Sequence, residues 1–229
     1  IRTDEADVSQ QRVFFGGINV YLQEKFSLFR HTPRWLDRVF DANWLLRFVS
    51  RFAVKTQASQ LGDLTLSMLR GELGNQAKEI DKLADWLEAD IRPEVINLTN
   101  VLLSGMVGRL RERLGVPMVG SLQGDDVFLE MLPEPHRSQA IDLISRHCEG
   151  MDGFIATSRY YADFMSGYLR IPRERIEVVA PGLNLDAHSG AAGERSSTGP
   201  CVIGFFARIC PEKGLHNLVE AYCRLRLRS

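Results

Sequence analysis

Residues 153–182, GFIATSRYYADFMSGYLRIPRERIEVVAPG, decide the fold that the sequence predicts. The apolar first five residues predict a strand, and the pattern that follows predicts a helix at 159–169, with Thr157 or Ser158 as its cap. A second strand is predicted at 176–180 and ends at a Pro-Gly turn. Together these elements make one βαβ unit, which is typical of a parallel sheet.

The same alternation is found toward the N-terminus. Strands are predicted at 95–98 and 117–122, and helices at 104–114 and 136–149. Alternating strands and helices favour an α/β fold with a Rossmann-like parallel sheet flanked by helices. Before residue 90 the apolar spacing predicts helices only, at 19–29, 35–52, 61–71 and 75–89.

Composition places the chain among ordinary globular proteins. Its 229 residues are 45% hydrophobic and 25% charged, with a net charge of −1. Because this balance gives no basic field, nucleic acid is not expected as a partner. The four cysteines show no C-x-x-C spacing, which indicates reduced thiols and a cytoplasmic protein. No apolar run approaches the roughly 18 residues of a membrane span.

Two domains are expected, with a linker between them. Residues 186–200, DAHSGAAGERSSTGP, contain no large apolar side chain, and this composition is typical of linkers. The predicted organisation is therefore a first domain at 1–184 and a linker at 185–200. Residues 201–229 then form the first strand and helix of a second Rossmann-like domain.

The stretch VIGFFARICPEKG at 202–214 predicts a phosphate site. An apolar strand at 202–207 would place Arg208 and Lys213 on a turn, and a helix is predicted at 216–227. Ligands of open α/β sheets bind at the carboxyl ends of strands, where a helix N-terminus adds positive potential. The planar fork of arginine and the point charge of lysine suit a diphosphate. The alternative is a pair of solvated turn residues.

Several sequence blocks are shared with one enzyme family. They are FFGGINVYLQ at 14–23, INLTN at 96–100, VPMVGSLQGDDVF at 116–128, DGFIATSRYYADFM at 152–165, IPRERIEVVAPGLN at 171–184 and FFARICPEKGLHNLVEAYCRL at 205–225. With these blocks in this order, the chain resembles the retaining glycosyltransferases of family 4. That family has the GT-B fold, in which two Rossmann-like domains face each other. Residues 30–90 match less well, since the family usually has strands there.

The resemblance implies transfer of a sugar from a nucleotide-diphosphate sugar to an acceptor hydroxyl, with retention at the anomeric carbon. No cofactor or metal is obligatory in such enzymes. The resemblance further implies that Arg208 and Lys213 bind the donor diphosphate. The backbone of Gly16 and Gly17 is implied to approach the same phosphates. Because negative charge gathers on the leaving diphosphate, catalysis is largely electrostatic stabilisation.

Gln123 departs from the family pattern. Many members have a histidine at this strand end, beside the donor sugar, and glutamine forms hydrogen bonds but does not titrate near neutral pH. We therefore expect Gln123 to orient a reactant and not to move a proton. Asp125 and Asp126 follow in the same loop, where helix capping and hydrogen bonding to the acceptor hydroxyl are both open.

The segment at 30–55 combines basic and aromatic side chains. Such a helix can lie on an anionic membrane surface, which suits a lipid-linked acceptor and a peripheral location at the inner membrane surface. The alternative is an aromatic face packed on the domain, with solvated arginines. A carbohydrate or lipid-linked acceptor is expected, and the oligomeric state is left open.

Two other functions stay open. The chain could be a non-catalytic GT-B sugar-binding module, which Gln123 favours, or a GT-B sugar-nucleotide epimerase or phosphorylase. The family also has two glutamates in its donor domain, near the nucleotide ribose and the reacting sugar. We expect them beyond Ser229, so the chain is expected to be truncated and inactive alone.

Overall fold

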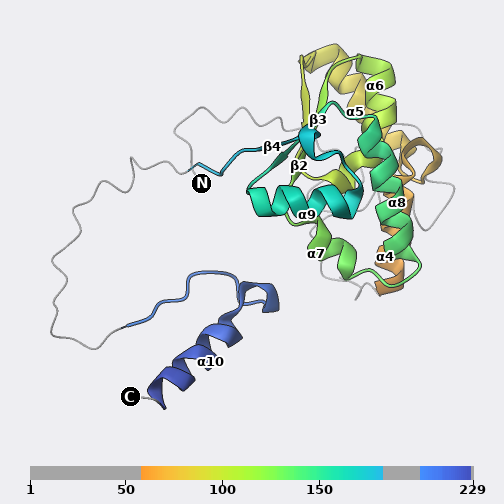
Figure 1. Cartoon of the computed structure of the whole chain (residues 1–229). Coiled ribbons are helices and arrows are strands. Elements are labelled where there is room, and N and C mark those ends of the chain that lie inside the picture. The colour runs from red at the N-terminus through yellow and green to blue at the C-terminus, as the bar shows by residue number, and fades with distance from the viewer. Residues whose placement is uncertain (1–57, 183–201, 228–229) are drawn as a thin grey trace, which may run out of the picture. The chain divides into compact units, whose positions relative to one another are not determined.

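The computed structural model describes residues 58–182 and 202–227 (Figure 1). The chain divides into two compact units, Ile1–Gly182 and Leu183–Ser229. The whole predicted linker at 185–200 falls outside the described residues, so the predicted domain boundaries stay a prediction.

Four parallel strands form the sheet of the first unit, in the order β1-β2-β3-β4. They are β1 (Ile96–Leu98), β2 (Met118–Leu122), β3 (Gly153–Ala156) and β4 (Ile176–Val178). From β2 onward, each strand pairs with its predecessor, so that Ile96 lies opposite Met118 and Phe154 opposite Ile176. The predicted α/β fold with a Rossmann-like parallel sheet is confirmed, and each of the four strands predicted between residues 95 and 180 is present.

Helices connect and flank these strands. The α-helices of this unit are α4 (Ala58–Leu69), α5 (Ala77–Trp86), α6 (Val107–Leu114), α7 (Asp125–Glu130), α8 (His136–Glu149) and α9 (Arg159–Leu169). Shorter helical turns are η2 (Gly71–Leu73), η3 (Leu87–Ile91), η4 (Val101–Met106) and η5 (Arg173–Arg175). The predicted helix at 104–114 is thus η4 followed by α6. Helix α7 is not among the elements predicted from the sequence.

The core lies on one face of the sheet. Along β2, Met118, Gly120 and Leu122 are buried, while the residues between them are less so. This alternation is typical of a strand with one face in the core. Gly120 makes room for the Phe154 ring, since a Cβ at residue 120 would come within 3.0 Å of it. Helix α9 packs on β2, β3 and β4 through the buried Ala162, Met165 and Leu169.

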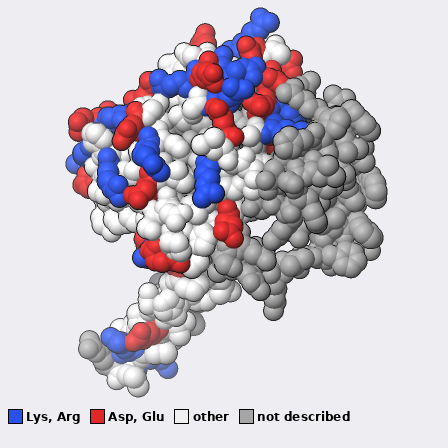
Figure 2. Space-filling view, turned by 90° about the vertical axis from the view of Figure 1, so that its right-hand side faces the viewer, with Lys and Arg blue, Asp and Glu red and all other residues white. Residues whose placement is uncertain are grey.

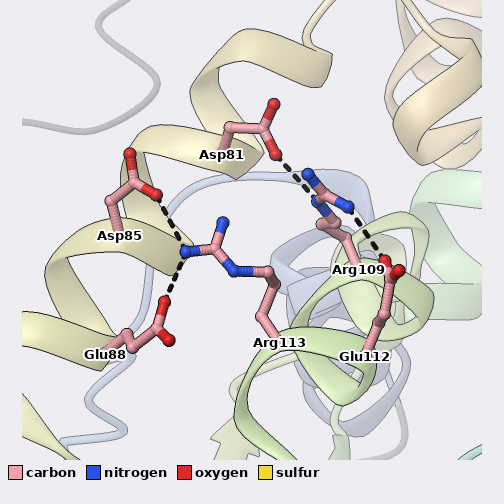
Figure 3. Close-up of polar contacts among 6 residues, drawn as sticks. All are labelled: Asp81, Asp85, Glu88, Arg109, Glu112 and Arg113. Carbon is pink, nitrogen blue, oxygen red and sulfur yellow. Dashed lines mark hydrogen bonds and ion pairs between the residues drawn. The ribbon is translucent and has the colours of Figure 1, made fainter.

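Ion pairs join helix α5 to helix α6. Arg109 and Arg113 stand one turn apart on α6, and Figure 3 shows both guanidinium groups pointing at carboxylates of the neighbouring chain segment. Arg109 donates to Asp81 at 2.8 Å, and Arg113 donates to Asp85 at 3.0 Å and to Glu88. On the face that Figure 2 shows, basic and acidic side chains are interspersed over the described residues.

In the second unit, the predicted strand at 202–207 is wrong. Residues 202–206 have no regular structure. A strand is held by hydrogen bonds to a neighbouring strand, and within the described residues this segment pairs with none. The predicted helix at 216–227 is confirmed as α10 (Leu215–Arg226). It follows the short turn η7 (Pro211–Lys213).

Candidate active site

The loops after β1, β2 and β3 lie at the carboxyl edge of the sheet, because parallel strands end on the same side. Ligands of open parallel sheets bind at this edge. The loops bring Thr99 and Asn100 after β1, Gln123 and Gly124 after β2, and Ser158 after β3. Hydrogen bonds connect the β1 and β2 loops to each other, and Tyr161 of α9 connects the β2 loop to the helix that follows β3.

Gln123 stands at the end of β2 with an exposed but anchored side chain. Its Nε2 donates to the carbonyl oxygen of Thr99 at 2.7 Å, and its backbone N–H donates to Oδ2 of Asp125 at 3.1 Å. The Oε1 atom accepts no hydrogen bond from the described residues. It can therefore accept one from a hydroxyl group of a ligand. The predicted place of Gln123 at the strand end is confirmed, and its role with a reactant stays a prediction.

Asp125 ties the β2 loop to the β1 loop. The residue is only 3% exposed, and its Oδ1 accepts from the backbone N–H of Val101 at 3.1 Å. Burial raises the pKa of Asp125, although the hydrogen bonds from Gln123 and Val101 oppose that rise. The capping interpretation holds for a neighbouring helix: Asp125 satisfies the first N–H of η4, while the N-cap of its own helix is Gly124.

Asp126 points away from Asp125 and toward helix α9. Its Oδ1 accepts the hydroxyl proton of Tyr161 at 2.6 Å, and the same hydroxyl oxygen accepts from the N–H of Gly124 at 2.7 Å. Burial, followed by the hydrogen bond to Asp126, raises the pKa of Tyr161, so the hydroxyl keeps its proton. Gly124 has φ +90°, a conformation that glycine adopts without strain.

Ser158 caps helix α9. Its Oγ accepts from the backbone N–H of Tyr161 at 3.2 Å, which decides between the two predicted caps in favour of the serine. The cap fixes the first turn of α9 and with it the place of the Tyr161 side chain.

Sequence reasoning did not single out Asn100 or Tyr161 as site residues. The Oδ1 atom of Asn100 is buried and has no hydrogen-bond partner in the part of the chain that the structure describes. A buried acceptor without a donor costs free energy. The signal for Asn100 was its polar type directly after a strand. Tyr161 offered none, because its role depends on which loop α9 faces.

Arg208 and Lys213 belong to the second unit and are both exposed. Lys213 ends the turn η7, and Gly214, with φ +72°, leads into α10. Between the two cations in the sequence lies Glu212, whose pKa is lowered mainly by its own N–H and by Cys210, with the two positive charges adding to the effect. Binding of a phosphate by Arg208 and Lys213 stays a prediction.

Other predicted residues lie outside the described ranges. These are Gly16 and Gly17, and the whole basic, aromatic segment at 30–55. Within residues 58–182 and 202–227, no group of His, Cys, Asp and Glu side chains could hold a metal ion. None of the helices in those ranges has the length and apolarity needed to span a bilayer.

All described strands and helices of the first unit lie within a region that matches a known family. Residues 32–182 match the glycosyl transferase 4-like domain, which is well over half of the chain. The chain belongs to this glycosyltransferase family. The match contains the entire Gln123 loop of the glycosyltransferase domain and ends before Arg208 and Lys213. No curated protein and no solved structure matches the chain.

Proposed function

We propose that this chain is the acceptor-side domain, with the first part of the donor-side domain, of a retaining GT-B glycosyltransferase. The enzyme transfers a sugar from a nucleotide-diphosphate sugar to a hydroxyl of a carbohydrate or lipid-linked acceptor. The observation that carries the proposal is the Gln123 cluster, in which Gln123 is hydrogen-bonded to Thr99 and Asp125 at the carboxyl edge of a parallel sheet. This cluster lies within the region that matches the glycosyl transferase 4-like domain.

In this mechanism the protein supplies orientation and charge. The Oε1 atom of Gln123 accepts a hydrogen bond from a sugar hydroxyl, while its Nε2 stays bonded to Thr99. Arg208 and Lys213 stabilise the charge on the leaving diphosphate, so that no metal is required. Because Gln123 does not titrate, another group must accept the proton of the acceptor hydroxyl. We assign this role to the diphosphate oxygen that is released from the sugar.

The location and acceptor are part of the same proposal. The enzyme works in the cytoplasm, and residues 30–55 hold it at the inner membrane surface when the acceptor is lipid-linked. Support comes from the arginines and aromatic side chains of that segment.

A second candidate is a non-catalytic sugar-binding module. Gln123 favours it, since the side chain binds hydroxyl groups and does not titrate. The same cluster would then hold a sugar without transferring it.

The product of the complete reading frame and the 229-residue chain are each incubated with radiolabelled nucleotide-diphosphate sugars and an extract that supplies acceptors. We expect labelled product from the complete reading frame and none from the 229-residue chain. Gln123→Ala is expected to lower kcat/KM by about tenfold, the effect of one lost hydrogen bond to a reacting group.

The matched control is Gln139→Ala, on the exposed side of α8, which is expected to keep full activity. Robust transfer by the 229-residue chain would contradict the proposal that it needs further donor-side residues. Retained sugar binding without transfer by either protein would favour the binding module.

A further inference from the structure

Tyr161 connects helix α9 to the loop that carries Gln123. Its hydroxyl group makes two short hydrogen bonds, donating to Asp126 at 2.6 Å and accepting from the N–H of Gly124 at 2.7 Å. Both partners lie in the four residues that follow β2. One side chain of α9 therefore holds this loop at two points.

The place of Gln123 depends on this contact through its neighbour. Gly124 has no side chain, so its backbone N–H is the group by which the loop can be held at that residue. Its φ is +90°, and a Cβ at this position would meet no atom within 4 Å, so no side-chain packing holds it. On the other side of the residue, the N–H of Gln123 is held by Asp125, which is anchored at the β1 loop.

The backbone that carries the Gln123 side chain is thus held on both sides. Asp125 ties it toward β1, and Tyr161 ties its C-terminal neighbour toward α9. A phenol is well suited to the second tie, since a single hydroxyl acts as donor and acceptor at once. Phenylalanine would have the same shape but would leave both the Gly124 N–H and the Asp126 carboxylate without this partner.

We propose that Tyr161 is a positioning residue for sugar transfer, which sets the position of Gln123 by holding Gly124 and Asp126. The inference rests on the proposed function and extends it to a residue that touches neither sugar nor diphosphate. Side chains that are fixed in position at a reacting centre increase the reaction rate, because the reactive geometry is in place before the reactants bind.

The first test compares Tyr161→Phe with Tyr160→Phe in the 229-residue chain by amide hydrogen exchange. Tyr160 is the matched control, because it precedes Tyr161 on the same helix and is 79% exposed. We expect the Gly124 amide to exchange about tenfold faster in Tyr161→Phe and at the wild-type rate in Tyr160→Phe. Equal exchange at Gly124 in both variants and the wild type would overturn the proposal.

The second test measures transfer by the complete reading-frame product. Tyr161→Phe is expected to lower kcat by about tenfold with an unchanged KM for the donor sugar, at a thermal midpoint close to that of Tyr160→Phe. Faster exchange at Gly124 with an unchanged kcat would overturn the positioning role and leave the proposed function intact. Absence of transfer by the wild-type protein would instead overturn the proposed function, and with it the positioning role, whatever the exchange result.

Discussion

A single buried carboxylate, Asp125, holds two strand ends together. Each of its two oxygens accepts one backbone N–H, from Val101 and from Gln123. Burial disfavours the charge and raises the pKa, and the two N–H groups compensate part of that effect. An acidic side chain is needed here because both positions around the carboxyl group face donors.

We expect Asp125→Asn to destabilise the chain by about 1–3 kcal/mol. An amide has one acceptor oxygen, so its NH₂ group would face a backbone donor. Urea unfolding followed by circular dichroism measures the change.

The control is Asp142→Asn, in which the exposed carboxylate pairs with Arg170 at the surface. Its effect is expected to stay within about 0.5 kcal/mol. An equal loss of unfolding free energy in both variants would show that burial does not explain the contribution of Asp125 to stability.

Local sequence patterns predicted some helices and strands of this chain and missed others. The parallel strands from β1 to β4 were predicted from short apolar runs between turn signals, since such runs need only local residue preferences. Helix α7 was missed because six residues are too few for a periodic pattern. The segment at 202–207 has the apolar composition of a strand, but composition does not show whether a neighbouring strand is there to pair with it.

The sequence predicted where the candidate site lies in the fold better than it predicted the hydrogen-bond partners of the site residues. Gln123 was identified through the family resemblance, as the residue at a predicted strand end where many members have histidine, and the structure confirms its place at the end of β2. The contacts of Tyr161 with Asp126 join residues 35 apart in the chain. No local pattern indicates such a contact, because it depends on how α9 packs against the sheet.

The pairing of α5 with α6 is a property of two helices together. We expect Arg113→Met to lower the urea midpoint at low salt, because Asp85 and Glu88 lose their shared partner. At about 1 M NaCl the difference from wild type is expected to shrink, since charges are screened over about 3 Å. Midpoints measured at both salt concentrations check this.

Arg146→Met on α8 is the control, as Arg146 makes no ion pair with the described residues. If Arg113→Met lowered the urea midpoint equally at both salt concentrations, packing of the arginine stem would explain the decrease better than charge.

The division of the chain into two units predicts where a protease acts first. We expect trypsin to cleave at Arg195 before any site between residues 58 and 182, since the predicted linker at 185–200 has small and polar side chains. Mass spectrometry of early time points identifies the first cut. Arg195→Gln is expected to remove it, and an early cut within 58–182 would contradict the predicted linker.

The strand order has a consequence for how the protein is made. Among the described strands, β2, β3 and β4 each pair with the strand synthesised just before. From β2 onward, each of these strands therefore finds one pairing partner already present when it leaves the ribosome. The edge that carries Gln123 is bounded by β1 to β3, so the polypeptide can assemble it during translation, before the second unit has emerged.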